Sequence, residues 1–76
     1  MRAVIAHFAS TELASQIERL VRSRAGSQIE QLRVEVEGDT VILSGVARTY
    51  YAKQLATQAA LHEVPECEIC NSIDVQ

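Results

Sequence analysis

The sequence predicts one α+β domain of αββαβ order, with a three-stranded sheet and two helices packed on one face. An apolar stripe with the period of a helix comes first. Two runs in which apolar and polar residues alternate follow, one on each side of a short turn that contains glycine. A second helical stretch and a third alternating run complete the chain. The 76 residues make a single domain, because neither half could bury a core. Hydrophobic residues form 47% of the chain and aromatic residues only 4%, which predicts a thin core of Val, Ile, Leu and Ala.

The first helix is predicted from about Thr11 to Ala25. Ser10 and Thr11 are both good N-caps, and Glu12 falls in the first turn, where the helix dipole favours a negative charge. The apolar stripe consists of Leu13, Ile17, Leu20 and Val21. Gly26 follows as the stop signal.

A β-hairpin is predicted next. Leu32, Val34 and Val36 alternate with Arg33, Glu35 and Glu37, which indicates a strand with one solvated face. Gly38 lies in a tight turn, and the β-branched run 41–46 follows, so the two strands must be antiparallel. Gly45 marks a place where the second strand ends or bends, or where another backbone comes close.

The second helix is capped by Thr49 and cannot continue past Pro65. Its narrow buried face is predicted to consist of Ala52, Leu55, Ala56 and Ala59. The last strand places Cys67, Ile69, Asn71, Ile73 and Val75 on one parity. The second strand, this helix and the last strand form a right-handed crossover unit.

The hairpin and the last strand carry a recognisable pattern. It reads Val34-x-Val36-x-Gly38-x-Thr40-Val41-x-Leu43-x-Gly45-Val46, then an Ala-rich helix, then Val64-Pro65-x-Cys67-x-Ile69-x-Asn71-x-Ile73-x-Val75. This pattern resembles the BON domain, the bacterial domain of osmotically induced and nodulation-associated proteins, over roughly residues 12–76. The resemblance implies the αββαβ fold and a non-enzymatic role in binding phospholipid or a membrane-associated partner. The chain departs from the family's pattern at Glu66-Cys67, where a glycine-hydrophobic pair is usual.

Charge and the first residues restrict the class of partner and the compartment. The net charge of −3 and the pI of about 5.2 argue against a nucleic-acid binder. Residues 1–8 are too short and interrupted for a secretory signal, so we expect a cytoplasmic or otherwise soluble chain, or a periplasmic one if a signal peptide has been removed. Residues 1–10 are read as an edge strand, a helix lead-in or a disordered tail, ahead of a domain over residues 11–76.

No catalytic apparatus, cofactor or metal is expected. Cys67 and Cys70 lie on a predicted strand, where a spacing of three sends the two side chains to opposite faces, Cys67 toward the core. A zinc site made with His62 is the alternative reading. Asn71 has core parity and must find a hydrogen-bond partner, which we expect at the turn near Gly45 or at a helix end.

Six residues are the candidate binding surface: Arg19, Arg22, Arg33, Arg48, Tyr50 and Tyr51. Solvated faces are the default explanation for the arginines, and a basic patch for lipid head groups, with Arg24 and Lys53, is the sharper one. Of the two tyrosines that begin the second helix, one is expected to pack at the sheet edge and one to be exposed. The alternative function is protein interaction or self-association into a homo-oligomer through an unpaired sheet edge.

Overall fold

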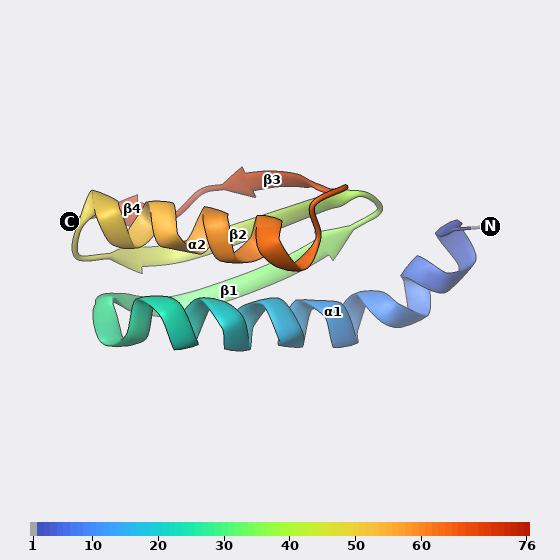
Figure 1. The fold of residues 1–76 in the computed structure, drawn as a ribbon, viewed down its shortest axis with the longest axis horizontal. Coiled ribbons are helices and arrows are strands. Elements are labelled where there is room, and N and C mark those ends of the chain that lie inside the picture. Colours follow the sequence, from blue (N-terminus) through green and yellow to red (C-terminus); the bar gives the residue numbers. More distant parts are fainter. Residues whose placement is uncertain (1) are drawn as a thin grey trace.

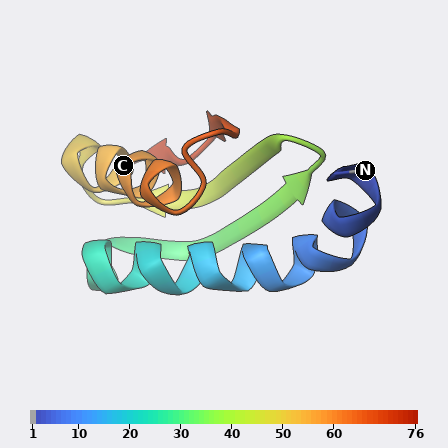
Figure 2. The same cartoon turned by 45° about the vertical axis from the view of Figure 1, so that its right-hand side comes forward.

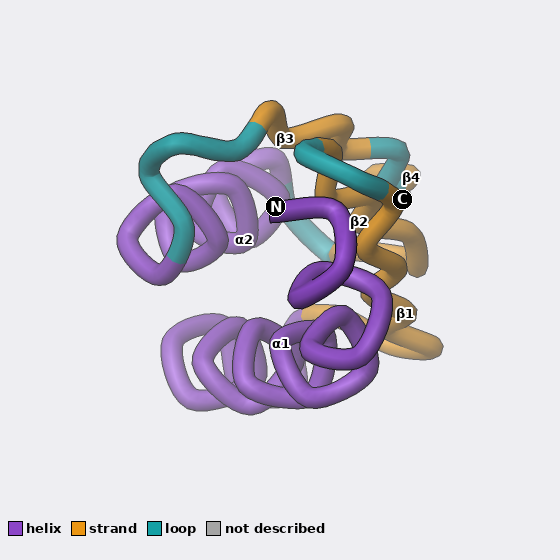
Figure 3. Tube along the Cα trace, turned by 90° about the vertical axis from the view of Figure 1, so that its right-hand side faces the viewer, coloured by secondary structure: helices purple, strands orange, loops and turns teal. Residues whose placement is uncertain are grey.

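The computed structural model describes the backbone of residues 2–76 and the side chains from residue 12 onward. The elements in chain order are α1 (Arg2–Ala25), η1 (Gly26–Gln28), β1 (Ile29–Glu37), β2 (Thr40–Ala47), α2 (Tyr50–Glu63), β3 (Glu68–Asn71) and β4 (Asp74–Val75). The two helices lie side by side on one face of the sheet, which leaves the other face uncovered (Figure 3). The predicted α+β class and element order are confirmed.

β2 is the central strand of the sheet (Figure 1). β1 pairs with it antiparallel on one side, and β3 and β4 pair with it parallel on the other. The single last strand that the sequence predicts is interrupted after Asn71 and is therefore two short strands. Between them the Ser72 amide still donates to the Leu43 carbonyl at 2.7 Å, so the segment stays on the edge of β2.

Helix α1 is longer than predicted. It begins at Arg2 and passes through Ser10 and Thr11, so the prediction of an N-cap at these residues is wrong. Alanine recurs at every third position from residue 3 to residue 9, and this strong helix former explains why a helix extends through the segment. Among the three readings of residues 1–10, residues 2–10 are helical, while Met1 lies outside the described residues. The division into an extension and a domain at residue 11 stays a prediction.

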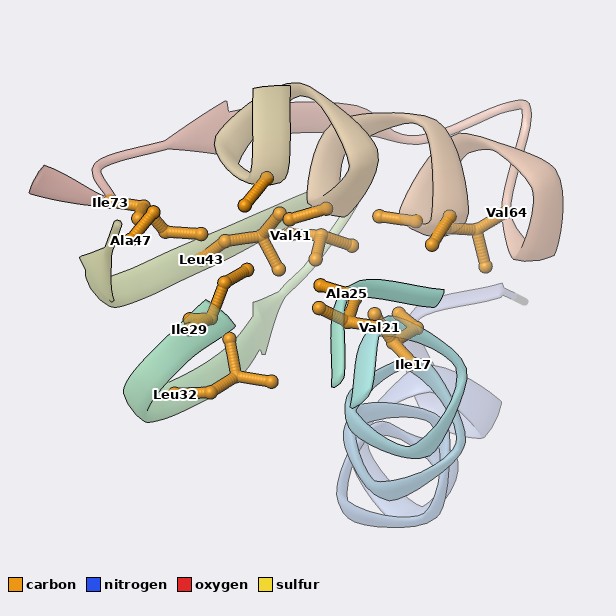
Figure 4. Close-up of a cluster of buried hydrophobic side chains, with 14 residues drawn as sticks. Ile17, Val21, Ala25, Ile29, Leu32, Val41, Leu43, Ala47, Val64 and Ile73 are labelled. Atoms are coloured by element: carbon orange, nitrogen blue, oxygen red, sulfur yellow. The ribbon is translucent and has the colours of Figure 1, made fainter. Parts of the chain in front are cut away.

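The core lies between the two layers (Figure 4). Helix α1 contributes Ile17, Val21 and Ala25, β2 contributes Leu43, and the β3–β4 connection contributes Ile73. Helix α2 buries only alanines, namely Ala52, Ala56, Ala59 and Ala60, and the predicted Leu55 is only half-buried. A face without long side chains lets the helix backbone approach the sheet closely.

A β-bulge interrupts β1 near its start. The register with β2 shifts between Glu30 and Arg33, and Gln31 has a positive φ of 57°. Opposite the bulge, Gly45 has a φ of 142°, and a Cβ built there would lie 2.9 Å from the Glu30 carbonyl oxygen. Of the readings that the sequence allows for Gly45, the close approach of another backbone is therefore the one that the structure shows.

Candidate binding site

One end of the molecule carries the exposed aromatic side chains. Tyr50 is 64% exposed and Tyr51 is 68% exposed, so the expectation that one of them packs at the sheet edge is wrong. The first turn of α2 turns both rings outward because Ala52 and Ala56 occupy its buried face. The Thr49 side chain caps this turn as predicted, accepting a 3.0 Å hydrogen bond from the Ala52 amide.

Backbone contacts bring the ends of η1, β2 and β4 to the same place. The Arg48 amide donates to the Gln28 carbonyl at 2.9 Å, which fixes the end of η1 beside the start of α2. The Gln76 amide donates to the Ala47 carbonyl at 2.9 Å, which places β4 there as well. We call this surface the tyrosine end, and it consists of Arg24, Arg48, Tyr50, Tyr51 and Val75. In Figure 1 it lies on the left, where α1 ends and α2 begins.

Exposed carboxylates contact two arginines of the predicted binding surface. Arg48 lies 3.1 Å from Glu30, and Arg22, in the last turn of α1, lies 3.0 Å from Glu18. All four side chains are at least 39% exposed. Ion pairs this open to water contribute little free energy, so both guanidinium groups can exchange their carboxylate partner for another anion.

The remaining two predicted arginines lie elsewhere. Arg19 is exposed one turn before Arg22 on α1, and Arg33 belongs to β1, where it pairs with Ser44 in the register. Arg33 lines an open hollow of about 740 Å³ with Gly45 and Asp74, and neither tyrosine is among the residues that line it. Arg48 precedes α2 instead of lying on it. The structure thus gathers Arg48, Tyr50 and Tyr51 and separates Arg33 from them.

The opposite end of the molecule is acidic. The hairpin turn and the α2–β3 connection meet there, since the Glu68 amide donates to the Asp39 carbonyl at 2.8 Å. Exposed carboxylates at this end come from Glu37, Asp39, Glu63, Glu66 and Glu68. The net negative charge therefore belongs mostly to the end away from the tyrosines.

Asn71 joins the last strand to helix α2. Its side-chain amide donates to the Lys53 carbonyl at 2.9 Å and to the Thr57 hydroxyl at 2.6 Å. Its side-chain oxygen accepts from the Ile73 amide at 3.0 Å. The expectation that Asn71 finds a partner is confirmed. One partner, the Lys53 carbonyl, lies in the first turn of α2, at a helix end as expected. The other partners lie farther along α2 and in the β3–β4 connection.

The two cysteines differ in burial as predicted, but only Cys70 lies on a strand, because β3 begins at Glu68, one residue after Cys67. Cys67 is half-buried and packs against the core, and Cys70 is exposed. Across the described residues, His, Cys, Asp and Glu side chains form no group of three that could hold a metal ion, so the zinc reading has no geometric support there. From residue 12 onward, no polar or charged side chain is buried.

A groove that the sequence did not reveal runs between α1 and β1. It has a volume of about 460 Å³ and is lined by Ala14, Ser15 and Glu18 of the helix and by residues 34–37 of the strand. Figure 2 shows α1 running alongside β1. The sequence gives no signal that these helix and strand positions are adjacent, so only the tertiary structure shows this groove.

Comparison with known proteins gives a family match that agrees with the fold. A family model described as the BON domain matches residues 9–67, which is more than half of the chain and runs from within α1 to the residue before β3. No curated protein matches the chain. No helix in the described part of the chain combines the length and the apolar character needed to cross a membrane.

Proposed function

The chain belongs to the BON domain family, and from this we propose that it is a non-catalytic module that attaches to phospholipid head groups through the tyrosine end. The observation that carries the proposal is the exposure of both Tyr50 and Tyr51 at the start of α2. Tyrosine suits a membrane–water boundary because its ring is apolar and its hydroxyl is polar. Val75, 43% exposed beside them, adds apolar area.

The arginines of this end supply the head-group contacts. The Arg48 guanidinium is 69% exposed, and Arg24 is exposed in the last turn of α1. A planar guanidinium binds phosphate through two parallel hydrogen bonds, and a phosphate can replace the exposed Glu30 partner at little cost. Each such cation adds about 1 kcal/mol of attraction close to an anionic bilayer.

A non-catalytic role agrees with the family, whose members are generally non-catalytic. It also agrees with the small core. Catalytic groups are usually tuned by burial, and between residues 12 and 76 the interior consists of aliphatic side chains. The hollow beside Arg33 and the groove between α1 and β1 are both open to solvent.

Vesicle co-sedimentation tests the proposal. The protein is mixed with vesicles of phosphatidylcholine alone or with added phosphatidylglycerol, at low and at physiological salt. We expect binding to the anionic vesicles that falls as salt rises, because salt screens the arginines. The double variant Tyr50→Ser with Tyr51→Ser should bind several-fold less.

Leu61→Ser is the matched control, because Leu61 is an exposed apolar residue of the same helix (40%) but lies near its other end. This variant should sediment like the parent protein. Attachment through the tyrosine end is wrong if the protein binds neither vesicle type at low salt. It is also wrong if the double tyrosine variant sediments with the vesicles as well as the parent does.

A further inference from the structure

We propose that the groove between α1 and the free edge of β1 binds an extended segment of a partner protein in which basic and apolar residues alternate. The segment joins the sheet as an additional strand beside β1. The proposal concerns a different surface from the tyrosine end and does not depend on lipid binding.

The backbone of β1 offers hydrogen-bonding groups at this edge. β1 pairs with β2 alone, so its second edge faces no strand of the described chain. Glu37 and Thr40 close a two-residue turn and must exchange hydrogen bonds with each other. In an antiparallel ladder bonded and non-bonded pairs alternate, so Glu35 also bonds to β2, whereas the N–H and C=O groups of Val34 and Val36 point to the open edge.

The helix wall leaves room for a strand at this edge. Ala14 and Ser15 line the groove from α1, and both have short side chains. Val34 and Val36 are half-buried at its base, where they pack on the edge of the core. An extended backbone at this position would bury their exposed parts and satisfy their outward polar groups together.

Strand parity and charge specify the occupant. Successive side chains of an added strand point to opposite faces. On the helix side they meet Ala14, Val34 and Val36, which favours apolar residues. On the uncovered face they lie beside Glu35 and Glu37, and opposite charges across neighbouring strands stabilise the pairing. The described residues that line the groove include three acidic ones, Glu18, Glu35 and Glu37, and no Lys or Arg. Glu18 is already paired with Arg22, so Glu35 and Glu37 carry the preference for Lys or Arg at the alternate positions.

A second copy of this chain fits the edge less well than an extended segment does. A helix with its side chains is about 10–12 Å wide, whereas neighbouring strands are about 4.8 Å apart. Two helices side by side are therefore wider than a sheet with the strand order β1-β2-β3, and α1 extends beyond the β1 edge (Figure 3). Pairing β1 with β1 of another copy would press the two α1 helices together, and an extended segment brings no such helix.

The test uses the full chain and a fluorescent peptide of alternating Lys and Val, with an alternating Glu and Val peptide as the charge control. We expect the Lys-Val peptide to bind and the Glu-Val peptide not to bind, by fluorescence anisotropy. Hydrogen exchange gives the direct readout. The Val34 and Val36 amides should exchange fast in the free protein and slow with peptide, while the Glu35 amide, bonded to β2, is protected in both states.

Two variants test the geometry. Val36→Pro removes an outward N–H without removing a bond to β2, so it should weaken peptide binding by about tenfold or more, whereas the isosteric Val36→Thr keeps the N–H and should bind normally. Ser15→Phe fills the groove from the helix side and should also block binding, which covers the case that the proline variant does not fold.

The outcomes separate the proposals. Absence of peptide binding, equal binding to Val36→Pro and Val36→Thr, or protection confined to residues away from β1 would each overturn strand addition in the groove. The double tyrosine variant should bind the peptide normally. Its loss of peptide binding would show that the peptide uses the tyrosine end, and the groove assignment would be wrong.

Discussion

The Asn71 side-chain amide donates a 2.9 Å hydrogen bond to the Lys53 carbonyl, across a sequence separation of 18 residues. The Lys53 carbonyl lies within α2, and Asn71 ends β3, so this bond joins the second layer of the fold to the edge of the sheet. The oxygen of the same side chain accepts from Ile73, one of the largest fully buried residues. One amide therefore holds the strand break and the helix together.

Replacing this amide should destabilise the domain. Asn71→Ala leaves the Ile73 amide and the Thr57 hydroxyl without their partner, and we expect a loss of about 1–3 kcal/mol in the free energy of unfolding. Urea denaturation followed by circular dichroism measures it. Cys70→Ala changes the exposed neighbour and should stay within about 0.5 kcal/mol of the parent; equal losses in the two variants would contradict the role given to Asn71.

Gly45 should tolerate substitution less than Gly38 does. Both have positive φ, but an added Cβ meets the Glu30 carbonyl at 2.9 Å at Gly45 and nothing within 4 Å at Gly38. Gly38→Ala should therefore cost about 1 kcal/mol of backbone strain alone. Gly45→Ala adds the clash with β1, and we expect about 3 kcal/mol. The thermal unfolding midpoints of the two variants compare them, and the idea fails if Gly38→Ala is the more destabilised.

Thr49 should contribute through its cap. Thr49→Ala removes the acceptor of the Ala52 amide, and we expect a loss of about 1 kcal/mol in the free energy of unfolding. Thr49→Asn keeps a capping oxygen and should recover most of the loss. Ser23→Ala, at an exposed position within α1, is the control for removing a hydroxyl.

The two thiols should differ in reactivity because only Cys70 is fully on the surface. Under mild oxidation we expect disulfide-linked dimers through Cys70, visible on a non-reducing gel. Cys70→Ser should abolish these dimers and Cys67→Ser should retain them. Dimers that persist in Cys70→Ser would mean that Cys67 reaches solvent more often than its half-buried position indicates.

The periodic parts of the fold could be predicted from the sequence. Strand alternation from Leu32 to Val36 and the helical stripe at Ile17 and Val21 follow directly from which side chains need burial. The bulge could not be predicted. Ile29 and Leu32 are both buried although they are three residues apart in a strand, and only the left-handed conformation of Gln31 makes that possible.

The candidate site was predictable in composition but not in arrangement. Arginine at position 48 and tyrosine at position 50 are residue types typical of a binding surface, and the Thr49 cap predicts where the helix begins. The exposure of both rings depends on the rotation of α2 about its axis, and the alanine face sets that rotation through packing. Likewise, the partners of Asn71 lie 14 and 18 residues away and depend on how the crossover returns to the sheet.

The central position of β2 has a consequence for synthesis. Its antiparallel neighbour β1 precedes it across a two-residue turn, but the residues that cover its other edge begin only at Glu68. A chain that terminates early and is released before Glu68 therefore contains the complete hairpin with one edge of β2 uncovered. We expect such a released fragment to misassemble with other chains, since an open strand edge is a template for pairing.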